Sequence, residues 1–214
     1  MWHMFMKNCI LKNNDVIFLN KKYFWYYKRF FDIFLSILLF PILIIVMIVV
    51  LFFNLIFNKG SLFFIQKRMG KNCKPFYAMK FRTMKYSKTI DRKFSDPLEH
   101  DRITNFGKVL RKYRIDELPQ ILNVLKGEMS LIGPRPDYYE HALIFLDNVP
   151  LYKERHAIRP GISGLSQIRY GYVEGLSETK KKTKIDLYYI HNVSLSLEIK
   201  VFFGTLYTII KGIN

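Results

Sequence analysis

The chain has 214 residues, which is enough for one domain with its own core plus one membrane element, and too few for two domains plus a membrane bundle. Half of the residues are hydrophobic, yet the formal net charge is +17. This combination is unusual for a soluble globular protein or a nucleic-acid binder, and it favours contact with an anionic membrane surface or a phosphate-bearing ligand.

The first 29 residues are predicted to form a basic and aromatic lead-in. Residues 21–29 read Lys-Lys-Tyr-Phe-Trp-Tyr-Tyr-Lys-Arg. Aromatic rings with a polar edge and long basic side chains are favoured in the headgroup layer of a membrane. We therefore interpret residues 1–29 as a membrane-interface segment and not as a domain.

An apolar segment follows, and no charged side chain occurs in residues 33–57. A straight helix of this length would reach about 37 Å, enough to cross a hydrocarbon core. Basic residues flank both ends, which indicates that both ends are cytoplasmic, and Pro41 removes a backbone donor near the middle. We expect a bent, re-entrant, proline-broken helix over residues 30–58, with Ser36 supporting the break. A proline-kinked helix that spans the membrane is the alternative.

Residues 59–214 are predicted to form one mostly α-helical domain on the cytoplasmic side. Two aromatic-rich runs, 61–68 and 75–84, flank a short polar turn and are typical of a β-hairpin. Helical patterns follow. The expected helices are 104–113, 116–125, 137–147, 177–191 and 196–211. For the last of them, packing on the core and resting on the membrane are both open.

The two cysteines, Cys9 and Cys73, lie far apart in unlike surroundings and match no metal-ligand spacing. They imply no disulfide framework. This is consistent with a body that faces the reducing cytoplasm.

An adjacent acid pair, Asp116 and Glu117, is the most informative feature of the domain. Pro119 is tolerated only in the first turn of a helix, so it places both carboxylates at a helix N-terminus, where free amides and the helix dipole favour a phosphate. Arg111 and Arg114 flank the pair. Mg²⁺ typically takes one or two carboxylates plus phosphate oxygens, which would leave the other acid as a nucleophile or base. An ordinary helix cap is the alternative interpretation.

Four further segments carry arginine, lysine or glycine in positions compatible with phosphate binding. Each segment alone is weak evidence for a phosphate site, because a single basic residue is usually a solvated surface charge and Gly-Pro clusters are usually turns. Together with the acid pair they favour a phosphate site, since rigid loops can hold guanidinium groups for bidentate contacts. The segments are 66–70, 80–84, 133–136 and 159–164.

The ordered series of motifs resembles the bacterial sugar transferase family, the monotopic polyprenyl-phosphate phosphoglycosyl transferases. The resemblance covers residues 28–211, nearly the whole chain, and the combined motifs are specific. They are KRFFD at 28–32, the proline-broken apolar helix, FIQKRMG at 64–70, KFRTM at 80–84, the stretch 111–123, MSLIGPRP at 129–136, RPGISG at 159–164 and DLYY at 186–189.

This resemblance implies transfer of a sugar 1-phosphate from a UDP-sugar to undecaprenyl (polyprenyl) phosphate, with release of UMP, through a covalent aspartyl-phosphosugar intermediate. It implies initiation of capsule, O-antigen or exopolysaccharide synthesis at the bacterial inner membrane, with the catalytic domain on the cytoplasmic face. It implies no nucleic-acid partner, leaves a homo-oligomer open, and does not say which sugar is transferred.

The resemblance also implies roles for individual residues. Asp116 would be the nucleophile, and Glu117 would be its catalytic partner and the Mg²⁺ ligand. The broken helix and residues 61–66 would meet the polyprenyl phosphate. The substrate-binding residues would be Lys80, Arg82, Arg111, Arg135 and Asp186 around the polar site, and Arg159, Gly161 and Gly164 in a loop near the nucleotide.

Two departures from the family pattern stand out. Phe40 replaces the serine that many members have before the helix-breaking proline, and Glu198 replaces a frequent Asp. Two other classes of protein remain as alternatives. A non-catalytic membrane scaffold would need no acid pair at a helix start. A membrane-associated nucleic-acid binder would explain the charge, but the aromatic residues concentrate in the lead-in and hairpin instead of interleaving with a basic surface.

Overall fold

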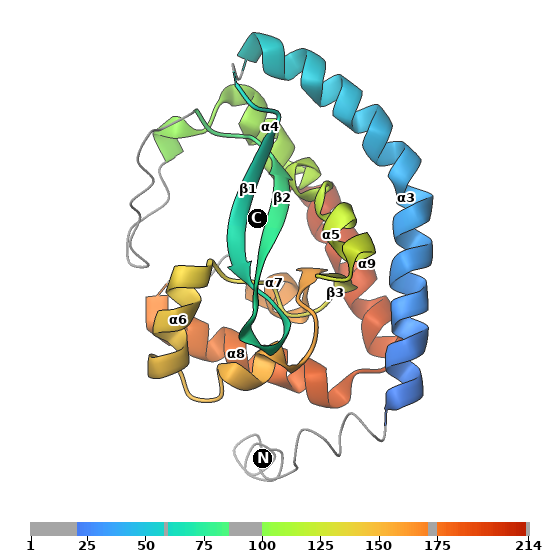
Figure 1. Cartoon of the computed structure of the whole chain (residues 1–214), viewed down its shortest axis with the longest axis vertical. Coiled ribbons are helices and arrows are strands. Elements are labelled where there is room, and N and C mark those ends of the chain that lie inside the picture. The colour runs from blue at the N-terminus through green and yellow to red at the C-terminus, as the bar shows by residue number, and fades with distance from the viewer. Residues whose placement is uncertain (1–20, 58–59, 86–99, 171–174, 213–214) are drawn as a thin grey trace.

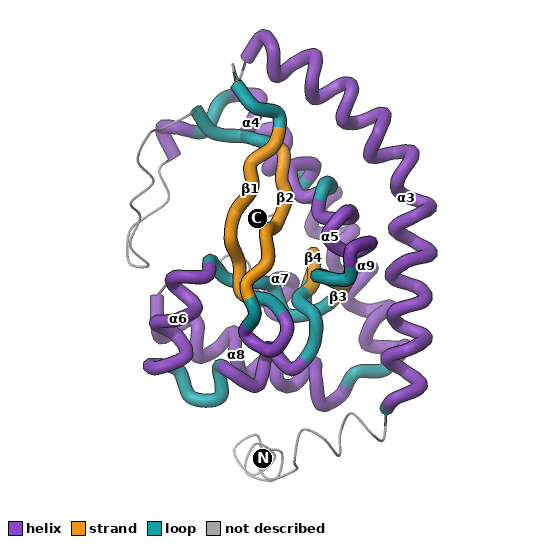
Figure 2. The backbone as a smooth tube through the Cα atoms, in the orientation of Figure 1, coloured by secondary structure: helices purple, strands orange, loops and turns teal. Residues whose placement is uncertain are grey.

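The computed structural model describes residues 21–57, 60–85, 100–170 and 175–212, and over these ranges the protein is mostly helical with two small sheets (Figures 1 and 2). The predicted fold class, mostly α with a β-hairpin, is confirmed. Residues 1–20 of the predicted lead-in, and with them Cys9, lie outside the described ranges. The elements are α3 Lys22–Phe57, β1 Phe63–Met69, β2 Pro75–Phe81, α4 Asn105–Lys112, α5 Gln120–Lys126, β3 Ser130–Ile132, α6 Tyr139–Asn148, β4 Gly161–Ser163, α7 Leu165–Tyr170, α8 Gly175–Asn192 and α9 Leu195–Lys211.

The predicted hairpin forms from β1 and β2, which pair antiparallel with Phe63 opposite Phe81 and Met69 opposite Pro75. The turn between them contains Asn72 in the left-handed region, a conformation that asparagine tolerates better than most residues. One face of the hairpin packs against α5 and the segment that follows it. The buried residues of this contact are Phe76, Ala78, Val124 and Met129.

Four of the predicted helices are confirmed as α4, α6, α8 and α9, with ends within two residues of those expected from the sequence. Thr104 caps α4 by accepting a 3.0 Å hydrogen bond from the Gly107 amide. The last helix, α9, buries Val201 on its inner face and exposes Phe203 and Ile210 on its outer face. Its inner face therefore packs on the core, while its outer face stays uncovered by the described residues.

A second sheet, not predicted from the sequence, pairs β3 and β4 in parallel, with Ser130 opposite Gly161 and Ile132 opposite Ser163. Glycine permits this close approach. A Cβ atom on Gly161 would lie 2.1 Å from the amide nitrogen of Gly133. The sheet thereby brings the loop after β3 against the loop that contains β4.

The long apolar helix α3 arcs around one side of the body (Figure 1). It begins eight residues before the predicted start at residue 30, and it continues without interruption through Pro41, so the predicted break is not present as a gap in the helix. At about 100° per residue, Pro41 lies opposite the buried face of the helix, and its side chain is exposed. A proline on the outer side relieves its steric clash by bending the helix, which explains an arc instead of a break.

The inner face of α3 begins with polar side chains. Lys28 forms a 2.6 Å ion pair with Glu198, and Asp32 accepts a 2.7 Å hydrogen bond from the Ser130 hydroxyl. The Oγ atom of Ser36 is buried and has no hydrogen-bond partner among the residues that the structure describes, so the predicted support of the helix at Pro41 by Ser36 is not seen. The buried residues along this face are Lys28, Asp32, Ser36, Leu43, Val50 and Asn54.

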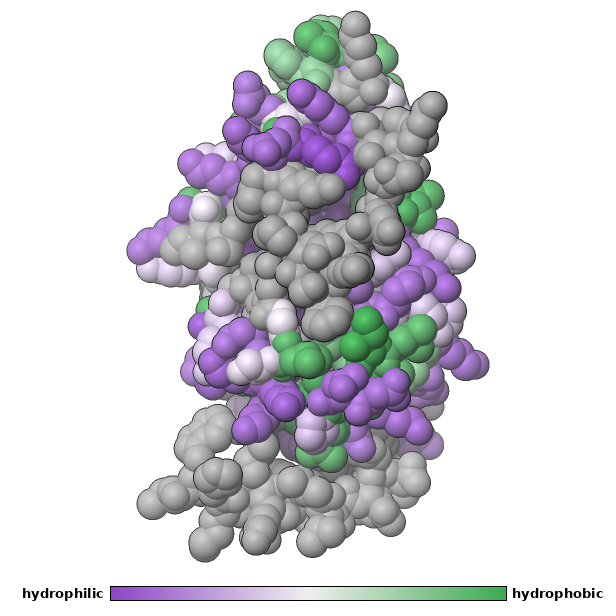
Figure 3. All heavy atoms as spheres, turned by 90° about the vertical axis from the view of Figure 1, so that its left-hand side faces the viewer, coloured by the Kyte–Doolittle hydropathy of each residue, from purple (hydrophilic) through white to green (hydrophobic). Residues whose placement is uncertain are grey.

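The outer face of α3 is apolar, and by length and composition the helix could cross a membrane. Large exposed hydrophobic side chains cover it from Phe30 to Phe57. The opposite side of the molecule differs, because hydrophilic residues cover most of its described surface beside a smaller apolar patch (Figure 3). The protein is therefore asymmetric, with its largest apolar surface on the side of α3.

Candidate active site

The acid pair lies in a single 3₁₀ turn, Ile115–Glu117, which leads through Pro119 into α5. The predicted position at a helix start is thus confirmed, although the first turn is 3₁₀ and α5 itself begins at Gln120. Arg114 enters the turn with a left-handed backbone, φ 54°. Both carboxylates are buried, with 8% of Asp116 and 6% of Glu117 exposed.

Glu117 is held by two basic side chains from different elements. The Lys80 ammonium on β2 lies 2.6 Å from Oε1, and Arg135 reaches both carboxylate oxygens, with 3.0 Å between its Nη1 and Oε2. Burial alone would raise the pKa of Glu117, but the charges and hydrogen bonds of Arg135 and Lys80 outweigh it and hold the pKa well below its usual range. Glu117 therefore stays ionised at neutral pH.

Asp116 differs from its neighbour because its carboxylate makes no hydrogen bond or ion pair with the described residues. Burial raises its pKa to about 6, with Glu117 adding to the rise and with Lys80 and Arg111 opposing it. Two adjacent carboxylates thus have pKa values shifted in opposite directions. Such a separation is typical of acids with different chemical roles in one site.

Basic side chains outnumber the two carboxylates around this turn. Besides Lys80 and Arg135, the charges of Arg111 and Arg114 act on the acid pair, and the charge of Arg68 acts on Lys80. The Arg111 Nε group donates a 2.8 Å hydrogen bond to the Thr83 hydroxyl. The excess of positive charge suits an anionic ligand such as a diphosphate.

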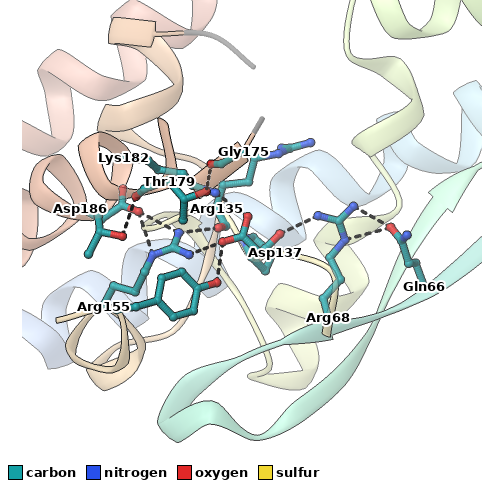
Figure 4. A network of polar contacts seen from close by, with 12 residues as sticks. Gln66, Arg68, Arg135, Asp137, Arg155, Gly175, Thr179, Lys182 and Asp186 are labelled. Carbon is teal, nitrogen blue, oxygen red and sulfur yellow. Dashed lines mark hydrogen bonds and ion pairs between the residues drawn. The ribbon is translucent and has the colours of Figure 1, made fainter. Parts of the chain in front are cut away.

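The loop that carries Arg135 is fixed by two other arginines, as Figure 4 shows. Arg155 donates to the carbonyl of Arg135 at 2.8 Å, and Arg68 donates to the carbonyl of Pro136 at 2.6 Å. Arg68 is itself oriented by Gln66, which accepts hydrogen bonds of 2.6 and 3.1 Å. The guanidinium of Arg135 is therefore presented to Glu117 from a rigid support.

Behind this loop lies a buried network whose charges balance (Figure 4). Arg155 pairs with Asp186 at 2.8 Å and also with Asp137, and Lys182 lies 2.5 Å from Asp137. Burial would raise the pKa of Asp137, but Lys182 and Arg155 lower it far below its usual value. Sequence reasoning missed three of these residues, Asp137, Arg155 and Lys182. The spacing of Lys182 and Asp186, four residues apart on α8, was the one local signal.

The structure places the remaining predicted substrate-binding residues outside direct contact with the acid pair. Asp186 is fully buried in the network behind Arg135. Arg82 donates to the Ser61 hydroxyl at 3.1 Å on the exposed side of the hairpin. Arg159 donates to the carbonyl of Gly127 at 2.7 Å, at the far end of α5 from the acid pair.

Gly161 and Gly164 lie close to the loop that carries Arg135. A Cβ atom on Gly164 would lie 2.4 Å from the carbonyl oxygen of Gly133, and the Gly161 amide donates to the carbonyl of Pro134 at 3.0 Å. These glycines support the Arg135 loop from one side, while Arg155 supports it from the other.

The chemistry of the acid pair fits Mg²⁺ only with help from a ligand. No group of three or more His, Cys, Asp or Glu side chains within the described ranges could hold a metal ion. A carboxylate offers about four acceptor positions, and Lys80 and Arg135 use three of those on Glu117. The remaining position, together with Asp116 or with phosphate oxygens, matches the one or two carboxylates that Mg²⁺ usually takes.

The fold and site therefore combine a buried acid pair, surrounded by an excess of basic side chains, with a long apolar helix in the same domain. Residues 23–212 match the family described as bacterial sugar transferase. The chain belongs to this family, which makes it a transferase.

The chain is also similar to individual proteins of known name. The chain is 45% identical over 154 residues to a UDP-N-acetylgalactosamine-undecaprenyl-phosphate N-acetylgalactosaminephosphotransferase of Aeromonas hydrophila, a match covering 72% of this chain and 36% of that protein. It is 36% identical over 189 residues to the exopolysaccharide production protein PSS of Rhizobium leguminosarum bv. phaseoli, covering 84% and 92%. It is 38% identical over 152 residues to a UDP-glucose:undecaprenyl-phosphate glucose-1-phosphate transferase of Klebsiella pneumoniae, covering 70% and 33%. The chain thus spans about a third of the Aeromonas and Klebsiella proteins and most of the Rhizobium protein.

Proposed function

We propose that this protein transfers a sugar 1-phosphate from a UDP-sugar to undecaprenyl phosphate, releasing UMP, and so starts the assembly of a polysaccharide. The observation that carries the proposal is the division of the acid pair. Asp116 is buried, bonds to none of the described residues and lies beside an excess of basic groups, whereas Glu117 is fixed by Lys80 and Arg135. The names of the relatives support the same donor and acceptor classes.

In the first step, a carboxylate oxygen of Asp116 attacks the phosphorus atom that bears the sugar. A new bond forms between that oxygen and phosphorus, the bond between phosphorus and the bridging oxygen breaks, and UMP leaves with the electron pair. In the second step, an oxygen of the lipid phosphate attacks the same phosphorus. The bond to Asp116 breaks, which restores the carboxylate and yields the sugar diphospholipid.

The fixed basic groups act on the charge that develops during both steps. Arg111 and Lys80 lie close enough to Asp116 to act on its charge, so they are placed to stabilise negative charge on the transferring group. Glu117 keeps Lys80 and Arg135 in place, since it bonds to both. Mg²⁺, when bound by the remaining acceptor position of Glu117 and by the diphosphate, would neutralise further charge on the donor.

The arc of α3 supports a re-entrant placement in the bacterial inner membrane, with the body on the cytoplasmic face. Its outer face is apolar along its length, and two polar side chains on its inner face tie its start to the body: Asp32 bonds to Ser130 of β3, and Lys28 pairs with Glu198 of α9. In this placement the helix enters the lipid and both of its ends return to the same side. A lipid phosphate in the headgroup layer then lies on the same side of the membrane as the Arg135 loop.

The identity of the sugar is a separate question. The names of the Aeromonas and Klebsiella relatives specify N-acetylgalactosamine and glucose respectively, so both donors belong in a first panel. Purified protein, undecaprenyl phosphate and Mg²⁺ would be assayed with each UDP-sugar for release of UMP. The donor with the largest kcat/KM identifies the sugar.

The test of the mechanism is the substitution Asp116→Asn. We expect it to lower UMP release at least about a thousandfold, because an amide cannot form the covalent intermediate. Asp147→Asn is the matched control, since it makes the same chemical change at an exposed position of α6 and should retain activity. Donor labelled in its sugar phosphate, added without lipid, should label the wild-type protein at residue 116. An active preparation that never carries this label, or an Asp116→Asn protein with normal UMP release, would overturn the mechanism.

A further inference from the structure

The segment after β2 forms an unusually close contact with the first turn of α4. A Cβ atom on Gly107 would lie 2.1 Å from the carbonyl oxygen of Thr83, closer than any side chain permits. The same carbonyl accepts a 3.1 Å hydrogen bond from the amide of Thr104, the residue that caps α4. The backbone of Thr83 is therefore pressed directly against α4.

This contact determines where Arg111 lies. Arg111 follows Gly107 by four residues, so both side-chain positions share one face of α4, one turn apart. The turn that rests on the backbone of Thr83 thus carries Arg111 over the Thr83 side chain. There the Arg111 Nε group donates a 2.8 Å hydrogen bond to the Thr83 hydroxyl. Thr83 is buried, with 5% of its surface exposed.

The hydrogen bond uses the inner nitrogen of the guanidinium. The two terminal nitrogens of Arg111 make no hydrogen bond with any residue that the structure describes, while the charge of Arg111 acts on Asp116. A guanidinium held by Nε keeps its outer edge free for a bidentate contact with a phosphate. Without the hydroxyl, the long side chain would sample several rotamers, and this orientation would be populated only part of the time.

We propose that Thr83 is a positioning residue for the transfer reaction, acting through Arg111. Its hydroxyl holds the guanidinium so that the terminal nitrogens meet a phosphate group beside Asp116, and Gly107 makes this possible by letting α4 rest on the Thr83 backbone. This inference rests on the proposed function for its effect on turnover. The hydrogen bond itself can be tested independently of any activity.

The first test compares three substitutions in the full 214-residue chain. Thr83→Val keeps the shape of the side chain and removes the acceptor, and we expect kcat/KM for UMP release to fall roughly tenfold to a hundredfold, the usual range for a lost hydrogen bond to a charged group. Thr83→Ser keeps the hydroxyl and should stay within about threefold of the wild type. Thr183→Val is the matched control, because Thr183 is also buried but its hydroxyl donates to the Thr179 carbonyl within α8, and the substitution should leave kcat/KM unchanged.

A double-mutant cycle separates positioning from a general structural role. If Thr83 acts through Arg111, then adding Thr83→Val to an Arg111→Ala protein should change kcat/KM by less than about twofold. A loss of the same size in both backgrounds would overturn the proposal. So would failure of Thr83→Ser to preserve activity.

The second test does not depend on turnover. In ¹⁵N-labelled protein, the Arg111 Nε–H signal is assigned by its absence in Arg111→Lys. Its exchange with water should be at least about tenfold faster in Thr83→Val than in the wild type, because a hydrogen-bonded N–H exchanges through opening. Equal exchange rates would refute the hydrogen bond. An inactive wild-type protein with a protected Nε–H would instead refute the proposed function and leave the positioning intact.

Discussion

The acid pair and the network behind the Arg135 loop use the same chemical groups with different charge balance. In the network, Asp137 and Asp186 are matched by Arg155 and Lys182, and both carboxylates are bonded. At the acid pair, the basic groups outnumber the carboxylates, and Asp116 has no bonded partner among the described residues. In a balanced buried network the charges are paired with one another, and the network fixes geometry. An unbalanced one keeps charge available for a ligand that the protein does not itself supply.

The largest expected effect comes from replacing Arg155, the central cation of the balanced network. Replacing it with Met leaves Asp137 and Asp186 buried with fewer partners, and we expect the free energy of unfolding to fall by about 3 to 5 kcal/mol. Denaturant unfolding of the full chain in detergent, followed by circular dichroism, measures this loss. The matched control is Lys181→Met, because Lys181 pairs with Glu178 on the exposed surface of α8 and should contribute little. Equal losses in the two variants would show that the network does not stabilise the fold.

A sharper form of the comparison applies one substitution, Asp to Asn, in both regions. Asp137→Asn should destabilise the protein at neutral pH, because the lowered pKa of Asp137 means that its ionised form favours folding at pH values above its unfolded-state pKa. Asp116→Asn should instead stabilise the folded protein at neutral pH. Burial raises the pKa of Asp116 from 3.8 to about 6, so its ionised form opposes folding, and removing the charge should add roughly 3 kcal/mol to the free energy of unfolding at pH 8.

The pH dependence provides the check on sign. The gain from Asp116→Asn should be full above about pH 6, shrink between pH 6 and 4, and vanish below the unfolded pKa of about 3.9, where the wild-type carboxyl is neutral in both states. Denaturant unfolding curves of the wild type and of Asp116→Asn at pH 4, 6 and 8 measure this change in the stability gain. A constant gain at all three pH values would mean that the amide stabilises the site for reasons other than charge.

The smallest expected effect is kinetic. Because the nucleophile must be ionised, UMP release in the first step, measured without lipid, should fall about tenfold for each pH unit below the pKa of Asp116, about 6. Single-turnover assays between pH 5 and 8, with circular dichroism to confirm folding, would locate this limb. A limb near pH 4 would show that donor binding restores an ordinary pKa to Asp116.

Local patterns predicted much of this protein. Two aromatic-rich runs around a short polar turn predicted the hairpin, and helical periodicity predicted α4, α6, α8 and α9. Pro119 predicted a helix start at the acid pair, because the restriction that proline imposes acts within one turn. Each of these rules depends on residues close together in the chain.

Features that depend on distant partners were not predictable from one sequence. Arg155 and Asp137 are 18 residues apart, and no local pattern distinguishes them from surface charges. Strands β3 and β4 have three residues each, too few for a period of two to be visible. At Pro41 the local rule predicted a break, but the outer position of the proline lets the helix bend and continue.

The outward position of Pro41 has a geometric consequence for α3. A straight rod of 36 residues would be about 54 Å long and would leave a small globular body after a few turns. The curved helix keeps one side in contact with the body from Lys28 to Asn54, while large apolar side chains on its convex side are left exposed by the rest of the described chain. A single proline thus lets one uninterrupted helix both pack along the side of the domain and present an apolar surface outward.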